Sequence, residues 1–337
     1  MSMCKLLSNN IKSFSMKIFI SGITGYVGRN LAKHFVHKHD VTGLSRGNKS
    51  ALHLEKLGVT VIKGDLQSEN LTKALLDYDV VIHTAADTDH RNVSKSQYDT
   101  NVIGTQRLVD AAKQAGVVKF IHISTESVLL TGEPLFQATE NMPYPKCAVG
   151  NYSDTKKMAE EIVVNASDSK FHAVVLRPRF IWGRDDTTAI PQIMSAIEKG
   201  QFAWINDGNY KTSATHIDNV CAGVDCAIER GQSGQTYFLS DDDDKTFKEL
   251  ISALVQAHNV EVPQRTIPRF VPLLLAKLDN IKRRIWPDAN PFPITMQEYA
   301  TSAVEVTLNI EKAKRELGYK PIVSFQQGVS EIKTANE

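Results

Sequence analysis

The sequence has few cysteines, no long apolar run and almost no net charge, and each of these absences excludes a class of protein. The 337-residue chain has four cysteines and no CxxC pair, which argues against a zinc or dithiol redox site and favours a reducing, cytoplasmic compartment. No apolar stretch approaches the ~20 residues that a membrane-spanning helix needs. The 39 basic and 38 acidic side chains leave a formal charge of +1, so nucleic acid is not an expected partner.

Short apolar runs alternate with helical patterns through the first half of the chain, and this alternation predicts the fold. It is typical of an α/β protein: a doubly wound parallel sheet of the Rossmann type, with a smaller C-terminal cap that binds the substrate. The predicted strands are residues 17–21, 40–45, 59–63, 80–83, 119–123, 173–176 and 236–239. The predicted helices are residues 25–36, 69–76, 102–115, 152–164, 190–199, 217–229 and 247–257.

The same pattern suggests how the chain divides into domains. Residues 16–185 are expected to form the dinucleotide-binding core, to which residues 211–240 return. Residues 186–210 and 241–334 are expected to form most of the cap. Residues 1–15 are interpreted as a disordered extension, or as residues that precede a natural start at Met16.

A glycine-rich turn, GITGYVG, follows the first predicted strand and opens the first predicted helix. Gly22 permits a tight bend, Gly25 lets the backbone approach a pyrophosphate, and Gly28 allows the helix to pack closely on the strand. The helix N-terminus offers unpaired N–H groups and the positive end of its dipole to the phosphates. The turn, which also contains Thr24, Tyr26 and Val27, therefore predicts a nicotinamide dinucleotide site.

The residues after the second strand bear on the choice between NAD and NADP. An acid at this place would accept hydrogen bonds from the ribose of NAD, whereas Arg46 is a cation suited to the 2′-phosphate of NADP, and Ser45 adds a hydroxyl. We therefore expect NADP, with NAD as the alternative and a solvent-facing arginine as the other interpretation of Arg46. Further cofactor contacts are expected after the third and fourth strands, from Asp65, Leu66, Thr84, Ala85 and Ala86.

Tyr152 and Lys156 are four residues apart on a predicted helix, so they share one face. The pKa of a free phenol is about 10, and a neighbouring ammonium favours the phenolate. This pair is suited to general acid and base catalysis, and Lys156 can also donate to the nicotinamide ribose. Ser124 and Thr125, at the end of the fifth strand, offer hydroxyl groups to a substrate oxygen that becomes an alkoxide.

Together these motifs resemble the extended short-chain dehydrogenase/reductase superfamily over residues 16–334. Four further stretches resemble its 3β-hydroxysteroid dehydrogenase and epimerase/dehydratase branch: NVIGT at 101–105, LRPRFIWG at 176–183, THIDNV at 215–220 and ELGYKP at 316–321. The resemblance implies that Tyr152 is the general acid/base and that Lys156 tunes it. It implies that Thr125 polarises the substrate oxygen, with Ser124 as the alternative, while hydride passes between the nicotinamide C4 and a substrate carbon.

The resemblance also assigns roles to less distinctive residues. Asn101 would lie near the active site, unless it only caps the helix that follows. Pro178 and Phe180 would border the nicotinamide. Arg46 departs from the acid that many steroid-type members have at this place, which favours reduction with NADPH over steroid oxidation.

The cap is less informative about the substrate, for which a hydrophobic, steroid-like or other lipid-like small molecule is expected. Residues 267–285 are apolar with basic residues between, and predict an amphipathic helix that packs on the core or else contacts a lipid or membrane surface. Trp182 and Tyr210 either line an apolar pocket or belong to the core. His216 either faces the substrate or caps the helix after it. The acids at 241–244 predict a solvated loop without EF-hand spacing, and no metal site is expected.

The leading hypothesis is an NADP(H)-dependent oxidoreductase that interconverts a carbonyl and a secondary alcohol. A homodimer is the expected assembly if the chain associates. One alternative is a nucleotide-sugar epimerase or dehydratase with tightly held NAD. Its sugar nucleotide would need a pyrophosphate clamp, for which Arg177, Arg179 and Arg184 are the candidates. The other alternative is a non-catalytic NADP-sensing regulator, against which the Tyr152–Lys156 pair argues.

Overall fold

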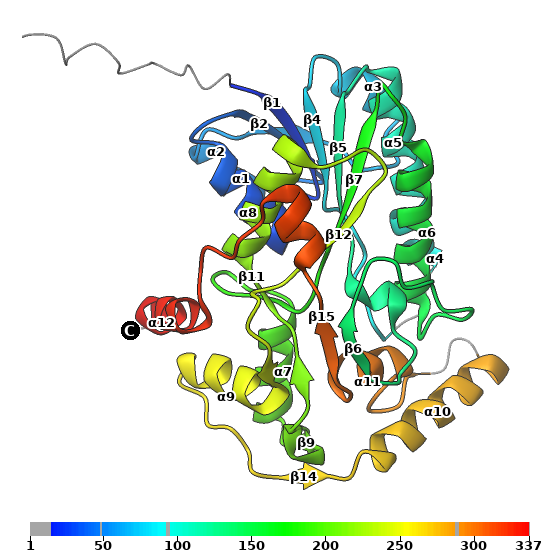
Figure 1. The fold of residues 1–337 in the computed structure, drawn as a ribbon, viewed down its shortest axis with the longest axis vertical. Helices are drawn as coiled ribbons and strands as arrows, with labels where there is room; N and C mark the ends of the chain where they lie inside the picture. The colour runs from blue at the N-terminus through cyan, green and yellow to red at the C-terminus, as the bar shows by residue number, and fades with distance from the viewer. Residues whose placement is uncertain (1–14, 48, 92–94, 287–289, 337) are drawn as a thin grey trace, which may run out of the picture.

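The computed structural model describes residues 15–47, 49–91, 95–286 and 290–336, so the extension expected at residues 1–15 lies outside the described residues apart from Ser15. The main feature of this part of the chain is a seven-stranded parallel sheet (Figure 1) in the order β12-β7-β5-β4-β1-β2-β3. The strands are β1 (Lys17–Ser21), β2 (Asp40–Ser45), β3 (Thr60–Lys63), β4 (Val80–His83), β5 (Lys119–Ile123), β7 (His172–Pro178) and β12 (Thr236–Leu239). The chain runs outward from β1 to β3, returns to β4 beside β1, and continues in the opposite direction. This order confirms the predicted doubly wound fold.

Helices cover both faces of this sheet (Figure 1). One face carries α1 (Tyr26–Phe35), α2 (Lys49–Lys56) and α8 (Ile217–Arg230), and the other carries α3 (Leu71–Ala74), α5 (Gly104–Gln114) and α6 (Asn151–Ala166). Successive residues of a strand point to opposite faces, so Ile18 and Ile20 pack against the first group of helices and Phe19 against the second. Because both faces of the sheet are covered, central strands such as β1 and β4 are nearly continuous apolar runs, and this made them predictable.

A smaller sheet lies below the parallel sheet in Figure 1, in the order β13-β10-β15-β6. Its strands are β6 (Leu135–Ala138), β10 (Lys211–Thr212), β13 (Lys245–Thr246) and β15 (Val306–Leu308). Two further pairs join β8 (Ile181–Trp182) to β11 (Thr215–His216) and β9 (Trp204–Ile205) to β14 (Thr266–Ile267). All of these strands are only two to four residues long, too short to show a period in the sequence.

Five helices surround the smaller sheet: α7 (Ala189–Glu198), α9 (Phe247–Ala257), α10 (Phe270–Ile285), α11 (Met296–Ser302) and α12 (Phe325–Asn336). The helices α7, α9 and α12 share one apolar cluster with Trp182 and Trp204. The helices α10 and α11 share another cluster with Leu130 and Val306. None of the described helices is long and apolar enough to cross a membrane. The division into a core and a cap, with the boundaries given above, stays a prediction.

Two predicted helices differ from those observed. The helix expected at 69–76 is only Leu71–Ala74, and Asp77 behind it has a left-handed φ of 68°, which no helix continues through. The helix expected at 102–115 is α5, and it follows a π-helical turn, η1 (Asp99–Ile103), and a short helix, α4 (Lys95–Tyr98). The π-helical turn has no sequence period of its own, and such turns are often found at functional sites.

A substitution at Gly28 tests whether α1 must pack closely on the turn after β1. A Cβ atom added there would lie 2.9 Å from Ile23 Cα and closer still to the carbonyl oxygen of Gly22, and backbone atoms cannot move aside as a side chain can. We expect Gly28→Ala to lower the free energy of unfolding by about 2–3 kcal/mol in urea denaturation. Gly200→Ala is the matched control, because a Cβ there meets open space and costs only the strain of a φ of 65°, about 1 kcal/mol. Equal losses would contradict the steric explanation.

Candidate active site

The predicted site residues follow different strands but lie at one edge of the parallel sheet. The carboxyl ends of parallel strands share an edge, and the strand order reverses between β1 and β4, where ligands bind in doubly wound folds. The positions concerned are Gly22 after β1, Arg46 after β2, Asp65 after β3, Thr84 after β4, Ser124 after β5 and Phe180 after β7. The topology therefore brings the predicted residues together from separate parts of the chain.

The glycine turn has the geometry that a pyrophosphate site requires. Gly22 has a φ of 70°, and a Cβ on it would lie 2.7 Å from the backbone of Ala85. Gly25 is the N-cap of α1 and supplies no side-chain cap, so the first N–H groups of α1 face the turn without a side-chain acceptor. The side chain of Tyr26 is buried, which leaves its backbone N–H as its contribution. These residues fit the phosphates of a dinucleotide.

The predicted cofactor-binding side chains after β2 and β3 differ in exposure, and some of them are already used in local hydrogen bonds. Arg46 is exposed, whereas Ser45 is buried and its hydroxyl accepts a hydrogen bond from Gly47 N at 3.1 Å. Asp65 uses its carboxylate locally, because it accepts from Gln67 N at 2.9 Å, and Leu66 is buried against α5 near Gly104. The adenine contacts of Asp65 and Leu66, and the phosphate contact of Arg46, stay predictions.

Thr125 and Tyr152 come together at the carboxyl end of β5. Thr125 caps the 3-10 helix η2 (Glu126–Leu129) by accepting from Ser127 N at 3.2 Å, and its side chain lies close enough to Tyr152 to affect the pKa of the phenol. Its hydroxyl donates to Glu126 Oε2 at 2.9 Å. Ser124 is buried beside it, and the Ser124 hydroxyl has no hydrogen-bond partner among the described residues. Both candidate hydroxyl groups therefore lie at this site.

The pKa of Tyr152 differs from the sequence-based expectation. A neighbouring Lys156 was expected to lower it, but burial raises the pKa of Tyr152 well above its usual value, and the Glu126 carboxylate raises it further. The nearby Thr125 side chain lowers the pKa of Tyr152 but is outweighed. Desolvation disfavours the charged phenolate, so the phenol is protonated at neutral pH.

Lys156 is held by hydrogen bonds to residues of β5. Its ammonium donates to the carbonyl oxygen of Ile123 at 2.8 Å and lies 3.3 Å from His122 Nε2. Burial lowers the pKa of Lys156 to about 8, although the Glu160 carboxylate acts against this. Burial also lowers the pKa of His122, and the Lys156 charge lowers it further, so this imidazole is neutral and can accept. The ribose contact of Lys156 stays a prediction.

Asn101 lies inside the π-helical turn η1 and does not cap a helix, so that alternative is wrong. Its amide accepts from Asp87 N at 2.8 Å, donates to Asp87 O at 3.0 Å, and donates to Thr155 Oγ1 at 3.1 Å. Thr155 is the residue before Lys156 on α6. Asn101 therefore joins the loop after β4 to the helix that carries Tyr152.

Glu126 was not predicted from the sequence, and Arg179 was considered only as part of a pyrophosphate clamp. They form a buried ion pair, and Arg179 also donates to Thr212 Oγ1 at 3.1 Å and to Thr301 O at 3.0 Å. The sequence does place Glu126 directly after Ser124 and Thr125. Only the fold shows that this acid faces Arg179, which is 53 residues away. His90 was also not predicted, and the centroid of its ring lies 4.7 Å from the centroid of the Tyr152 ring.

Two of the predicted substrate residues belong to the core. Trp182 is fully buried and donates from Nε1 to Asp241 Oδ2 at 2.7 Å. Tyr210 is buried against Phe247 and donates to Ser302 O at 2.5 Å. Asp241 departs from the predicted solvated loop, because its carboxylate also accepts from His216 N and Asn219 Nδ2, and burial raises its pKa to about 6. Asp242 and Asp243 are exposed, as that prediction expected.

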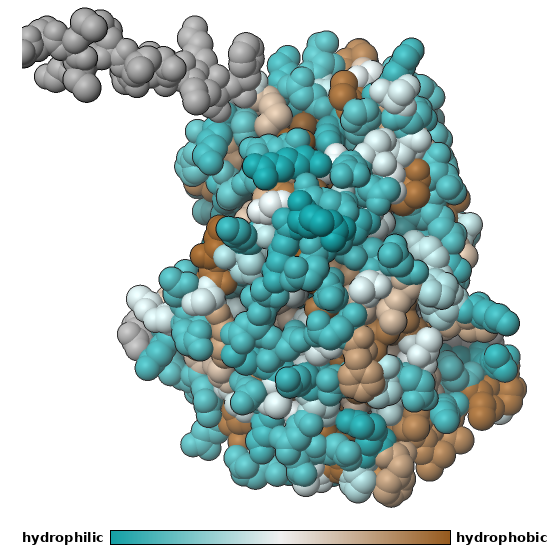
Figure 2. Space-filling view, viewed as in Figure 1, coloured by the Kyte–Doolittle hydropathy of each residue, from teal (hydrophilic) through white to brown (hydrophobic). Residues whose placement is uncertain are grey.

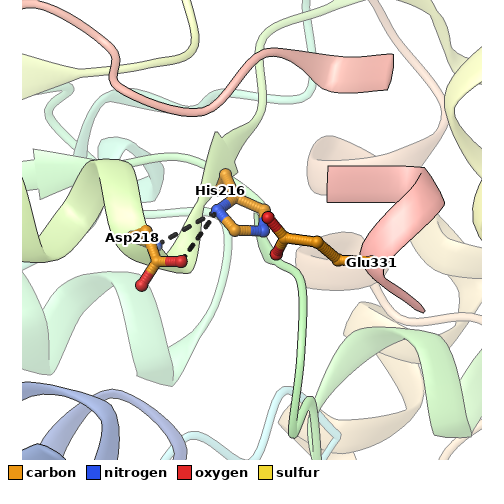
Figure 3. Close-up of side chains that lie close together, drawn as sticks. All are labelled: His216, Asp218 and Glu331. Atoms are coloured by element: carbon orange, nitrogen blue, oxygen red, sulfur yellow. Dashed lines mark hydrogen bonds and ion pairs between the residues drawn. The ribbon is translucent and has the colours of Figure 1, made fainter. Parts of the chain in front are cut away.

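His216 caps α8, which confirms one of its two interpretations (Figure 3), and its contact with the substrate stays a prediction. Its Nδ1 accepts from Asp218 N at 3.2 Å, which places the ring hydrogen on Nε2, the atom that faces Glu331 in Figure 3. His216, Asp218 and Glu331 offer ligand atoms within 4.8 Å of one another. Asp218 is already paired with Arg184, so a cation would have to displace both this ion pair and the cap.

The three arginines considered as a pyrophosphate clamp all have carboxylate partners. Arg177 pairs with Glu160 at 2.6 Å, and the other two pair with the acids Glu126 and Asp218 described above. An arginine held in this way is not free to bind a diphosphate. Between two of them, Pro178 ends β7 and Phe180 has a strained φ of 39°. Their contact with the nicotinamide stays a prediction.

Comparisons with known proteins agree with this geometry. The sequence profile described as the 3-beta hydroxysteroid dehydrogenase/isomerase family matches residues 19–270. A 4-hydroxy-2-methyl-3-oxo-4-farnesyl-3,4-dihydroquinoline-1-oxide ketoreductase of Stigmatella aurantiaca is 37% identical, over 95% of this chain and 96% of that protein. A decarboxylating sterol-4-alpha-carboxylate 3-dehydrogenase of Dictyostelium discoideum is 28% identical, over 94% and 99%.

The solved structures extend the likeness to the fold. A UDP-glucuronic acid 4-epimerase from Bacillus cereus, in complex with UDP-glucuronic acid and NAD, has a TM-score of 0.73 and 21% identity. The match covers 95% of this chain and all of that one. At this identity the likeness shows the shared α/β fold alone.

The burial of Lys156 predicts a pH-dependent stability. The folded protein releases this proton near pH 8, whereas the unfolded chain holds it until about 10.5, so the wild type gains stability as the pH rises between these values. Lys156→Met lacks that gain. We expect urea denaturation to show that the unfolding free energy of the wild type, relative to that of Lys156→Met, is about 2–3 kcal/mol higher at pH 10 than at pH 7.

Lys157→Met provides the control for this measurement. Lys157 is the next residue on α6 and is partly exposed, so its removal should change the unfolding free energy equally at both pH values. A difference between wild type and Lys156→Met that does not change with pH would show that Lys156 keeps its proton throughout.

Proposed function

The chain belongs to the 3-beta hydroxysteroid dehydrogenase/isomerase family and is an NAD(P)-dependent oxidoreductase acting on CH–OH groups, and from that premise we propose that it reduces a ketone on a hydrophobic substrate with NADPH. The observation that carries this proposal is the position of Tyr152 close to Thr125 at the carboxyl edge of the parallel sheet, the edge that also carries the glycine turn. A protonated phenol suits reduction, because the reaction needs a proton for the new alkoxide.

The proposed mechanism assigns each step to a side chain. Bound NADPH supplies the hydride. Tyr152 donates its proton to the substrate oxygen, and Thr125 polarises that oxygen once its hydroxyl turns from Glu126, with Ser124 as the alternative donor. Lys156 places a positive charge next to β5, where it stabilises the phenolate that remains after proton transfer.

Support for NADPH comes from the end of β2. Arg46 is exposed there, and a guanidinium binds a phosphate with charge-assisted hydrogen bonds. NAD is the alternative cofactor, and it is the one named for the Bacillus cereus structure.

Support for a lipid-like substrate comes from two relatives. The Stigmatella aurantiaca protein is named as a ketoreductase of a farnesyl-bearing compound, and the Dictyostelium discoideum protein is named as a dehydrogenase of a sterol carboxylate. Both names describe a polar reacting group on a large apolar body. We propose the same substrate class for this chain, and retain its cytoplasmic location and a homodimer as predictions.

The two alternative functions are less well supported. A sugar-nucleotide epimerase needs cations for a pyrophosphate, and the three candidate arginines are committed to carboxylates. A non-catalytic sensor does not require a tyrosine close to the Thr125 hydroxyl with a lysine one helical turn away, and the relatives are named as enzymes.

Tyr152→Phe tests the assignment of the proton donor. We expect NADPH consumption with a panel of apolar ketones to fall by about 10²–10⁴-fold, because the phenylalanine has no proton to donate, while the affinity for NADPH is retained. Tyr144→Phe is the control, since the Tyr144 hydroxyl donates to Glu160 at 2.7 Å and has no proposed role in the reaction. Undiminished turnover by Tyr152→Phe would refute the mechanism.

Arg46→Ala tests the choice of cofactor separately from the chemistry. Loss of the guanidinium should weaken NADPH binding by roughly 10–100-fold, measured by fluorescence titration, and leave NADH binding unchanged. Arg315→Ala removes an exposed arginine far along the chain and should affect neither cofactor. Equal losses for NADPH and NADH would show that Arg46 does not contact the 2′-phosphate.

A further inference from the structure

Two histidines lie buried on the face of the parallel sheet that α5 and α6 cover. His83 ends β4 and is paired in register with His122 of β5, and their ring centroids are 5.0 Å apart. Residues two apart on a strand share a face, so both rings follow the apolar side chains of Val81 and Phe120. The surface in view in Figure 2 is mostly hydrophilic, whereas polar rings inside the core need a reason to be there.

The hydrogen bonds of His83 are complete without Lys156. Thr105 Oγ1 donates its single hydrogen to Asn101 O at 2.6 Å, so it accepts from His83 Nε2 at 2.9 Å. His83 Nδ1 therefore accepts from Ser21 Oγ at 2.7 Å. His83 is thus a neutral ring with both nitrogens in use, and burial lowers its pKa to about 3.

His122 differs, because within the described residues its side chain has one hydrogen-bond partner, Lys156. Its Nε2 lies 3.3 Å from the Lys156 ammonium, and its Nδ1 is buried with no partner in that part of the chain. An ammonium has only donors, so Nε2 accepts and the ring hydrogen lies on Nδ1. A buried N–H without a partner destabilises the fold, and an apolar residue would avoid this penalty. The contact with Lys156 is therefore what explains a histidine at this position.

The charge of Lys156 has little other compensation. The carbonyl oxygen of Ile123 accepts from its ammonium at 2.8 Å. The opposite charge that acts on it is Glu160, one turn further along α6, and this carboxylate is already paired with Arg177 at 2.6 Å. The His122 acceptor therefore matters to the charge. The charged and titratable groups on the elements around this pair are His83 from β4, Glu126 from η2, Tyr152 and Glu160 from α6, and Arg177 from β7.

We propose that His122 is a positioning residue, which accepts a hydrogen bond from Lys156 and keeps that side chain charged and in place for the reaction. The proposal rests on the function proposed above, in which the Lys156 charge stabilises the Tyr152 phenolate. Ile123 O and His122 Nε2 each accept one N–H, so the third remains for the predicted ribose contact. Because Thr125 is only three residues after His122, β5 holds both the charge and the hydroxyl at the site.

The protonation of Lys156 can be followed without cofactor or substrate. His122→Phe keeps a ring but removes the acceptor, so the ammonium is harder to hold and the pKa of Lys156 in the folded protein falls below about 8. The unfolding free energy then begins to rise at a pH about one unit lower than in the wild type. Urea denaturation from pH 6 to pH 10, with each protein compared with its own Lys156→Met partner, measures this onset. His122→Gln restores an oxygen acceptor at the same number of bonds from Cα, and should return the onset to that of the wild type.

The pH dependence of turnover is the second measurement. With NADPH and a ketone, kcat of the wild type should fall as Lys156 loses its proton near pH 8, and kcat of His122→Phe should fall about one pH unit lower. A purely structural role would lower kcat equally at every pH. His172→Leu is the control, because His172 lies at the start of β7 with Nε2 3.3 Å from Ser169 O, and it should leave both onsets unchanged.

Three results would overturn the proposal. They are a wild-type onset of the stability rise in His122→Phe, an equal shift in His122→Gln, and a pH profile of kcat that does not move. His122→Leu replaces His122→Phe if the latter does not fold, since it also removes the acceptor. No turnover of any ketone by the wild type would count against the proposed reaction, whereas a shifted stability onset would still support His122 as the acceptor of Lys156.

Discussion

The ion pair between Glu126 and Arg179 lies where the parallel sheet meets the smaller sheet, and both layers contribute to it. Each of the two side chains is buried, so neither charge is tolerable without the other. Glu126 accepts from Thr125 at the end of β5, and Arg179 follows β7 and donates to Thr212 in β10 and Thr301 in α11. One pair of charges therefore holds the hydroxyl proposed for catalysis in register with elements of the smaller layer.

The same carboxylate affects the chemistry of the site. It raises the pKa of Tyr152 in addition to burial, while burial of Lys156 weakens the cation that would act in the opposite direction. The site thus contains a Tyr152 phenol that stays neutral and a Lys156 ammonium that loses its proton more readily than a free lysine. Burying these groups without full compensation costs stability, which is common where an active site needs particular protonation states.

The sequence was most informative where one pattern extends over many residues. The buried strands and the glycine turn could be predicted because a continuous apolar run, or three glycines spaced between a strand and a helix, is compatible with few local structures. The spacing of Tyr152 and Lys156 predicted a shared helix face but gave the wrong direction for the phenol pKa, since desolvation and Glu126 depend on the tertiary fold. Trp182, Tyr210 and His216 were ambiguous for the same reason, because a buried aromatic and a pocket aromatic look alike in a sequence.

The pairing of β6 with β15 has a consequence for how the chain folds. Gln137 N in β6 donates to Thr307 Oγ1 in β15, 170 residues further along the chain, so the smaller sheet cannot close until β15 has been synthesised. The strands through β7 are all available much earlier. During synthesis, β6 therefore lacks its partner strand for some time, and the apolar side chain of Phe136 is exposed on it. A nascent chain that stalls in this interval holds a nearly complete parallel sheet together with a strand open to wrong partners.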